Sequence, residues 1–124
     1  MKVLRLLLFF IAIACMEHAC SPKTSPEIAV TPIPNYKGPL IRYSIDVQPI
    51  LERSCSPCHF PSLGGDRQPL DSFRAVKSTA AEILKRIQLP HDKRAFMPFK
   101  LAQEPLSQKE IEVIRNWVLG AYKM

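Results

Sequence analysis

Residues 47–59 read VQPILERSCSPCH, and this stretch lies near the middle of the 124-residue chain. It begins as an amphipathic helix, because one face collects three apolar side chains at helical spacing, Val47, Ile50 and Leu51. Asp46 precedes that face and is the predicted N-cap, while Pro49 falls in the first turn, where its missing N–H costs little. We expect this helix to end at Cys55, the first residue of a Cys-x-x-Cys-His pattern.

The pattern formed by Cys55, Cys58 and His59 is typical of the covalent attachment of a c-type haem. Two intervening residues let both thiols reach the two vinyl positions along one edge of a haem. The histidine that follows then falls under the iron as an axial ligand. The sequence therefore predicts one haem c, with Cys55 and Cys58 as its thioether anchors and His59 as its proximal iron ligand.

Three other readings of the pattern are weaker. A structural zinc site would need a fourth ligand, and His91 is the only further candidate in the helical part of the chain. A thioredoxin-like redox pair would require a βαβ context, for which the sequence gives no sign. A disulfide between Cys55 and Cys58 is strained at this spacing and leaves His59 without a role.

A haem iron needs a sixth ligand or an open site, and the chain offers Met97, His91 and Met124. Met97 stands in a loop predicted over residues 90–106, and Pro98 biases it to an extended conformation. We therefore expect Met97 to be the distal ligand. His91 is a weaker competitor, and Met97 acting only as loop packing is the alternative.

The remaining pattern is helical, with no strand alternation and no internal repeat. Ser72 begins a short helical turn, and Thr79 to Glu82 form a capping box that opens a further helix, which Pro90 ends. Ser107 to Glu110 form a second capping box. The last helix then has an inward face of Ile111, Ile114, Trp117, Val118 and Ala121 and an outward face of Lys109, Glu112, Arg115 and Asn116. The predicted fold class is all-α.

Residues 1–15 read MKVLRLLLFFIAIAC and are predicted to be a signal peptide with a lipobox. Two basic residues open the segment, and the apolar run at residues 6–14 is too short to span a bilayer. Small residues precede Cys15, as in bacterial lipoprotein signals, so we expect export and lipidation at Cys15. Ordinary cleavage is the alternative, and it leaves Cys15 and Cys20 free to pair.

Residues 16–40 are rich in proline and show no helical or strand period, so they are predicted to be an extended linker. A tail without a role is the competing interpretation of this segment. The predicted domain then occupies residues 41–124. A core of that size is marginal on its own, and a large apolar cofactor would stabilise it.

The formal net charge is +6, and it falls to +4 once Lys2 and Arg5 of the predicted leader are removed. A spread charge of this size usually serves solubility. The sequence has no dense basic run and no basic helix with interleaved aromatics, so nucleic-acid binding is not expected. Three basic residues flank Met97 and would guide an acidic redox partner to it, Lys93, Arg94 and Lys100.

From about Ser44 to Tyr122 the chain resembles the small class I cytochrome c domain of bacteria. The matching pieces are Val47-Gln48-Pro49-Ile50-Leu51, Cys55 to His59, Gly64-Gly65, Leu70-Asp71-Ser72, Ile83 to Ile87, Met97-Pro98 and Leu106 to Ala121. The resemblance implies three to four helices around one covalently bound haem, with the first and last helices crossing. It also implies His59 as proximal ligand, Met97 as distal ligand and Trp117 as packing at the helix crossing.

Better-known members of this family have a proline after the attachment motif whose carbonyl accepts the proton of the proximal histidine. Pro61 and Pro69 are both candidates here. Such a bond would orient His59 and raise its basicity.

An iron bound by both His59 and Met97 has no position left for a substrate. The expected function is single-electron transfer between redox proteins in the periplasm or at a membrane surface, and not enzymatic catalysis. The alternative is a ligand-binding, sensing or peroxidase-like module, which requires an open sixth site. A further possibility is a subunit that relays electrons within a fixed complex.

Overall fold

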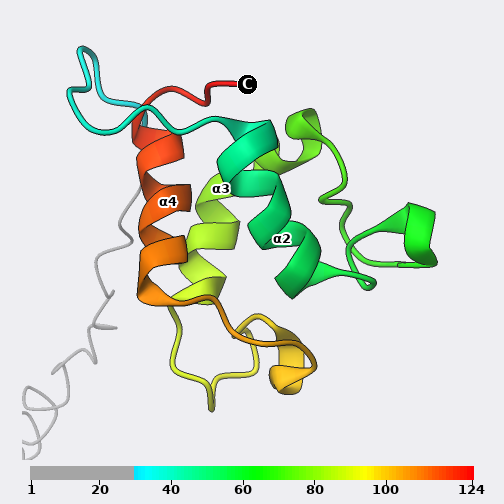
Figure 1. Cartoon of the computed structure of the whole chain (residues 1–124). Coiled ribbons are helices and arrows are strands. Elements are labelled where there is room, and N and C mark those ends of the chain that lie inside the picture. The colour runs from blue at the N-terminus through cyan, green and yellow to red at the C-terminus, as the bar shows by residue number, and fades with distance from the viewer. Residues whose placement is uncertain (1–29) are drawn as a thin grey trace, which may run out of the picture.

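The computed structural model describes residues 30–124, so the predicted leader and residues 16–29 of the predicted linker lie outside the described part. Three α-helices dominate, α2 (Gln48–Cys55), α3 (Phe73–Ile87) and α4 (Gln108–Leu119) (Figure 1). A π-helical turn, η1 (Tyr43–Val47), leads into α2, and two 3-10 turns, η2 (Pro61–Leu63) and η3 (Phe99–Leu101), lie in the connections. Residues 30–124 contain no strand, which confirms the all-α class.

The first helix starts earlier than predicted, and Asp46 is not its N-cap. The turn η1 runs directly into α2, and Arg42 stands at the N-cap position of η1. The N–H of Arg42 donates to the Asp46 carboxylate at 2.7 Å. Asp46, in the first turn of η1, thus satisfies a backbone N–H group that has no partner within the helix. Pro49 does fall in the first turn of α2, as expected.

Helix α3 corrects a second prediction, the capping box from Thr79 to Glu82. One continuous helix begins at Phe73, and the side chain of Ser72 caps it by accepting the N–H of Ala75 at 3.3 Å. The Thr79 hydroxyl donates back to the carbonyl of Ala75 at 2.9 Å, so Thr79 lies within the helix. No Gly or Pro interrupts residues 73–87, and the helix therefore has no reason to break at this point.

Helix α4 begins with the predicted capping box, in which Ser107 and Glu110 each accept an N–H of the other's backbone. Four of the five predicted inward side chains are buried, Ile111, Ile114, Trp117 and Val118. Ala121 is exposed, contrary to the prediction. The helix ends at Leu119, and Ala121 has a positive φ of 62°, which turns it out of the helical path.

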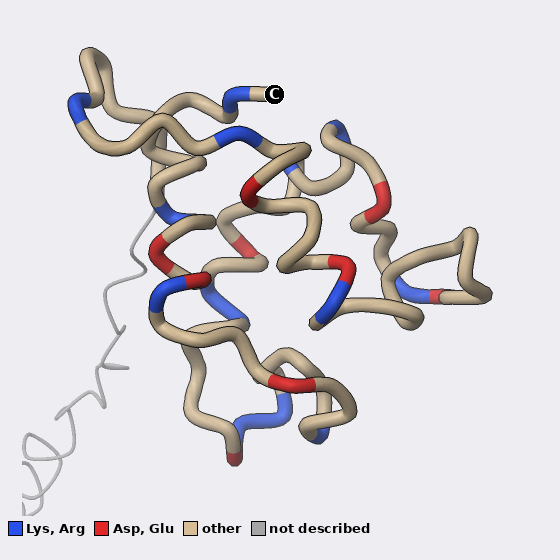
Figure 2. Tube along the Cα trace, in the orientation of Figure 1, with Lys and Arg blue, Asp and Glu red and all other residues tan. Residues whose placement is uncertain are grey.

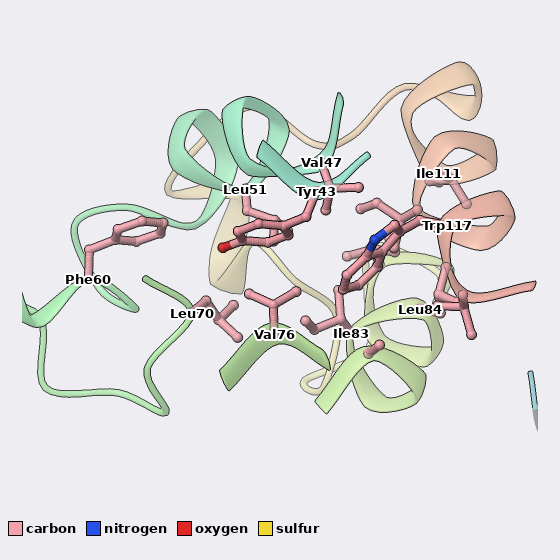
Figure 3. Close-up of a cluster of buried hydrophobic side chains, with 14 residues drawn as sticks. Tyr43, Val47, Leu51, Phe60, Leu70, Val76, Ile83, Leu84, Ile111 and Trp117 are labelled. Carbon is pink, nitrogen blue, oxygen red and sulfur yellow. The ribbon is translucent and has the colours of Figure 1, made fainter. Parts of the chain in front are cut away.

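The core is centred on Trp117, where the first helical segment, α3 and α4 meet (Figure 3). The ring of Trp117 lies 5.7 Å from that of Tyr43 and 5.9 Å from that of Phe73, measured between centroids. The carbonyl of Lys123 accepts both the Tyr43 N–H, at 3.0 Å, and the Trp117 Nε1–H, at 2.7 Å. Backbone and side chain together therefore fasten the C-terminal tail to η1.

Residues 30–40, which the sequence assigns to the linker, contact the C-terminal part of α4. The N–H of Ile33 donates to the Leu119 carbonyl at 3.0 Å. The Tyr36 hydroxyl donates to Oδ1 of Asn116 at 2.8 Å, which partly covers a side chain that the sequence places on the outward face. Within residues 30–124, no helix combines the length and the apolar character needed to cross a membrane.

Candidate functional site

A cavity of about 760 Å³ lies among the end of α2, the loop that follows it, α3 and the loop before α4. This volume is within the range of roughly 300–1,000 Å³ that is usual for ligand and cofactor sites. Its lining includes five apolar residues from these segments, Leu70, Ile83, Ile87, Pro98 and Phe99. It also includes Cys55, Cys58, His59 and Met97. The fold thus brings all four predicted site residues to one cavity.

The attachment motif continues α2 as a tight turn. Cys55 is the last residue of α2 and is half-buried, whereas Cys58 is exposed, and both are free thiols. The N–H of His59 donates to the Cys55 carbonyl at 3.0 Å, and the N–H of Phe60 donates to the Pro57 carbonyl at 2.9 Å. These bonds hold both thiols and the imidazole at the cavity.

Burial raises the pKa of the Cys55 thiol to about 11, although the positive charge of Arg53 acts in the opposite direction. The thiol is therefore protonated at neutral pH. Reactive cysteines of the thioredoxin type have a lowered pKa, because the thiolate is their nucleophile. The environment of Cys55 is thus the reverse of what a thiol–disulfide redox pair requires.

His59 is oriented by a carbonyl that the sequence did not identify. Its Nδ1 lies 2.7 Å from the carbonyl oxygen of Gln68, so neither Pro61 nor Pro69 is the partner. Because a carbonyl only accepts, Nδ1 carries a proton, and in the neutral imidazole the lone pair therefore lies on Nε2, where it can bind a metal. The N–H of Leu70 also donates to the His59 carbonyl at 2.8 Å, which ties the two segments together.

Two glycines let the loop after the motif fold back against it. Gly64 has a φ of +85°, in the left-handed region that favours glycine. A Cβ added to Gly65 would lie 2.2 Å from the Pro57 carbonyl oxygen and 2.5 Å from that of Cys58. The loop therefore reaches His59 only because residue 65 has no side chain.

Met97 comes to the cavity from the loop between α3 and α4. Its N–H donates to the carbonyl of Arg86, near the end of α3, at 3.4 Å. Phe96 and Pro98 on either side of it are buried, while Met97 itself is half-buried. The two buried neighbours anchor the loop and leave the thioether at the cavity wall.

The other two candidates for a distal ligand are not among the residues that line the cavity. His91 is exposed, and its ring packs on that of Phe96 with centroids 4.4 Å apart. Met124 is exposed beyond the far end of α4 (Figure 1). Of the three candidates, the structure brings only Met97 to the site.

Three arginines and one acid line the cavity, and the sequence singled out only Arg94 among them. Arg86 is paired with Glu82 at 2.6 Å, and Arg67 with Asp66 at 3.2 Å. Arg86 and Glu82 lie on the same side of α3 as Ile83 and Ile87. Their helical spacing would therefore have predicted that they line the cavity, if residues 73–87 had been predicted as one helix. Arg67 has no such local signal, because only the fold of its loop brings it to the cavity.

Ser54 is a further cavity residue that the sequence analysis did not predict. Its side chain is buried at 2% exposure, it lines the cavity, and its hydroxyl has no hydrogen-bond partner in residues 30–124. A buried hydroxyl without a partner is costly, since it has lost water and gained nothing.

The donor types that meet at the cavity are those that a c-type haem requires. They are two thiols separated by two residues, an imidazole whose Nδ1 contacts a carbonyl, and a thioether. In the described part of the chain, no group of three or more His, Cys, Asp or Glu side chains is arranged to hold a metal ion directly. The apolar walls suit a large, flat, apolar ligand.

No family model, no curated protein and no solved structure matches this chain. The resemblance to class I cytochrome c domains therefore depends on the sequence motifs. The chemistry of the site depends on the residues that line its cavity.

Proposed function

We propose that this domain is a monohaem c-type cytochrome of class I type that carries single electrons between redox proteins. The observation that supports it best is the meeting of His59, the two thiols and Met97 at one cavity, although Met97 is distant from the motif in sequence. Cys55 and Cys58 would hold the haem by thioether bonds. His59 and Met97 would be its axial ligands.

The chain's own residues prepare the site for this role. Gln68 holds the proton of His59 on Nδ1 and so leaves Nε2 free to bind. The bond from Met97 to the end of α3 fixes the loop that carries the second ligand. The apolar side chains of the cavity exclude water from the bound group.

Haem c ligated by imidazole and thioether supplies a one-electron couple, and the thioether raises its potential. If His59 and Met97 both held the iron, no position on it would remain for a substrate. The domain would accept one electron from a reduced partner and pass it to an oxidised partner, with no bond made or broken. Exposed Lys93, Arg94 and Lys100 near Met97 would favour partners with acidic surfaces.

The test is to express the chain with a haem-maturation system and record its spectra. We expect haem that stays on the chain in denaturant, and loss of this attachment in the double variant Cys55→Ala, Cys58→Ala. The oxidised protein should show the weak iron–sulfur charge-transfer band. Met97→Leu should abolish that band, whereas Met124→Leu and His91→Ala should keep it.

Rapid binding of carbon monoxide to the reduced wild-type protein would overturn the electron-carrier proposal. It would favour the alternative, a ligand-binding, sensing or peroxidase-like module with an open sixth site. Failure of the chain to retain haem at all would overturn both functions. Carbon monoxide binding and haem retention are both measured on the same sample by absorbance.

We also propose that the chain is exported and anchored through a lipid on Cys15, with the haem domain in the periplasm or at a membrane surface. The apolar run that ends at Cys15 supports this proposal. Labelled palmitate should be incorporated into the wild type and not into Cys15→Ser. Incorporation that survives this substitution would refute the anchor.

A further inference from the structure

One end of the domain combines exposed aliphatic side chains from two segments. Residues 30–45 and the tail after α4 lie together, at the end of the helices away from the Met97 loop (Figure 1). The Tyr43 N–H bond to the Lys123 carbonyl joins them, and both line a shallow cavity of about 350 Å³. Four large apolar side chains are exposed on these segments, Ile33, Leu40, Ile45 and Met124. We call residues 33–45 and 121–124 the terminal face.

The terminal face is also basic. Lys37, Arg42 and Lys123 are exposed, and none of their side chains forms an ion pair with residues 30–124. Figure 2 shows basic positions along the N-terminal segment and beside the C-terminus. Acids also lie near this face: the carboxylate of Asp46 accepts the Arg42 N–H, and burial together with the charges of Glu52 and Asp71 raises the pKa of Tyr43.

Several arginines elsewhere in the described residues are paired with acids. Arg53 is paired with Glu110 at 2.6 Å and with Glu104 at 3.3 Å. Arg86 and Arg115 are likewise paired with acids of their own helices.

At the terminal face, cations without an acid partner occur together with exposed aliphatic side chains, and this combination is typical of surfaces that lie on anionic lipid. The Met97 loop has a similar combination, Lys100 beside exposed Phe99 and Leu101, so the position of the proposed anchor distinguishes the terminal face from it.

The chain before Val30 connects this same face to the proposed anchor. Residues 16–29 separate Cys15 from the described domain. Even fully extended they span no more than roughly 50 Å, so a lipid on Cys15 would keep the domain within that reach of the bilayer. A tether of this kind raises the effective concentration of a weak second contact.

We infer that the terminal face rests on an anionic lipid surface and so turns the Met97 loop away from the bilayer. The aliphatic side chains enter the headgroup boundary, and Lys37, Arg42 and Lys123 contact the lipid phosphates. The haem cavity is then presented to partners in solution. This inference uses the proposed anchor but is independent of the proposed haem chemistry.

The experiment uses the full chain purified from membranes and reconstituted into two kinds of vesicle. One is phosphatidylcholine alone, and the other is equal parts of phosphatidylcholine and phosphatidylglycerol. Sedimentation with the vesicles measures binding through the lipid anchor. Amide hydrogen exchange measures whether the terminal face is protected by contact with the vesicle. We expect sedimentation with both vesicles, and at least several-fold slower exchange in residues 33–45 with the anionic vesicle only.

The double variant Lys37→Glu, Leu40→Glu should lose this protection. The matched control is Leu63→Glu, Lys109→Glu, which makes the same changes at other exposed sites. Leu40 and Leu63 are 64% and 61% exposed, and the control should keep the protection.

Equal exchange with both vesicles would overturn the inference and leave the anchor in place. Binding to the anionic vesicle alone would support the face and refute the anchor. Protection that persists in the Lys37→Glu, Leu40→Glu variant, or that appears only when a soluble protein is added, would also overturn the inference.

Discussion

The Nδ1 atom of His59 lies 2.7 Å from the carbonyl oxygen of Gln68, and this contact selects the tautomer of the neutral imidazole. The bond requires a proton on Nδ1, so in the neutral ring the lone pair lies on Nε2, where it can bind a metal. Phe60, which follows His59, and Leu70, two residues after Gln68, are both buried at 5% exposure. Packing therefore holds the bond in place from both segments.

Gly65→Ala should destabilise the loop that supplies this bond. The new Cβ would lie 2.2 Å from the Pro57 carbonyl oxygen, and only movement of the backbone relieves that clash. Overpacking of this kind costs about 1–3 kcal/mol, which urea unfolding would measure. Gly64→Asn is the comparison, because open space surrounds Gly64 and the variant meets only the strain of its φ of +85°, which asparagine tolerates better than most residues. Equal losses in both variants would contradict the close approach at Gly65.

If the domain binds haem as proposed, Met97→Ala should lower the reduction potential of the loaded protein. Axial ligands adjust haem potentials over a range of roughly 0.8 V, and loss of the thioether should cost on the order of 100 mV or more within it. Potentiometric titration provides the measurement. His91→Ala should leave the potential nearly unchanged, because His91 is not among the residues that line the cavity. A larger shift in His91→Ala than in Met97→Ala would reverse the ligand assignment.

Protonation of Glu110 should make the domain less stable in acid. Burial by itself would raise the pKa of this carboxyl, but hydrogen bonds from Ser107 and Arg53 and the charge of Arg53 hold it below its ordinary value. A lowered pKa in the folded state contributes stability above the unfolded pKa, which is about 4.3 for glutamate. That contribution is lost as the pH falls through the lower, folded pKa.

The free energy of unfolding should therefore fall less steeply with acid in Glu110→Gln than in the wild type below about pH 5. Urea unfolding at a series of pH values would measure the slope. Ser107→Ala should remove the cap of α4 and cost about 1 kcal/mol at neutral pH. An unchanged slope in Glu110→Gln would show that other acids account for the pH dependence.

Trp117→Phe should weaken the attachment of the C-terminal tail to the helical core. The substitution removes the Nε1–H that donates to the Lys123 carbonyl at 2.7 Å, and it leaves a cavity among Tyr43, Phe73 and Tyr122. Loss of the bond and of packing should cost about 2–4 kcal/mol together. Unfolding followed by far-ultraviolet circular dichroism would measure it.

Tyr122→Phe is the matched control for Trp117→Phe, because it keeps the ring that lies 5.1 Å from Trp117. We expect it to change the free energy of unfolding by less than about 1 kcal/mol. A similar loss in both variants would point to the whole tail and not to the indole.

Several features of this chain were readable from short stretches of sequence. The capping box of Ser107 and Glu110 is a contact between residues three apart, and the apolar face of α4 is a periodic pattern, so both are local. The helical class followed from the same kind of pattern. The Thr79 to Glu82 prediction was wrong because a capping-box pattern also occurs inside a helix. The structure shows one continuous helix over residues 73–87, so the Thr79 to Glu82 pattern lies inside a helix and does not begin one.

By itself the sequence determined the spacing of Cys55, Cys58 and His59, the apolar faces of the helices and the cap of α4. Only the tertiary structure decided that Gln68 orients His59, that Met97 and not His91 reaches the cavity, and that residues 30–40 pack against α4. Each of these contacts joins segments that are apart along the chain. Local propensity and periodicity carry no information about such pairs, because packing of the whole core determines which segments meet.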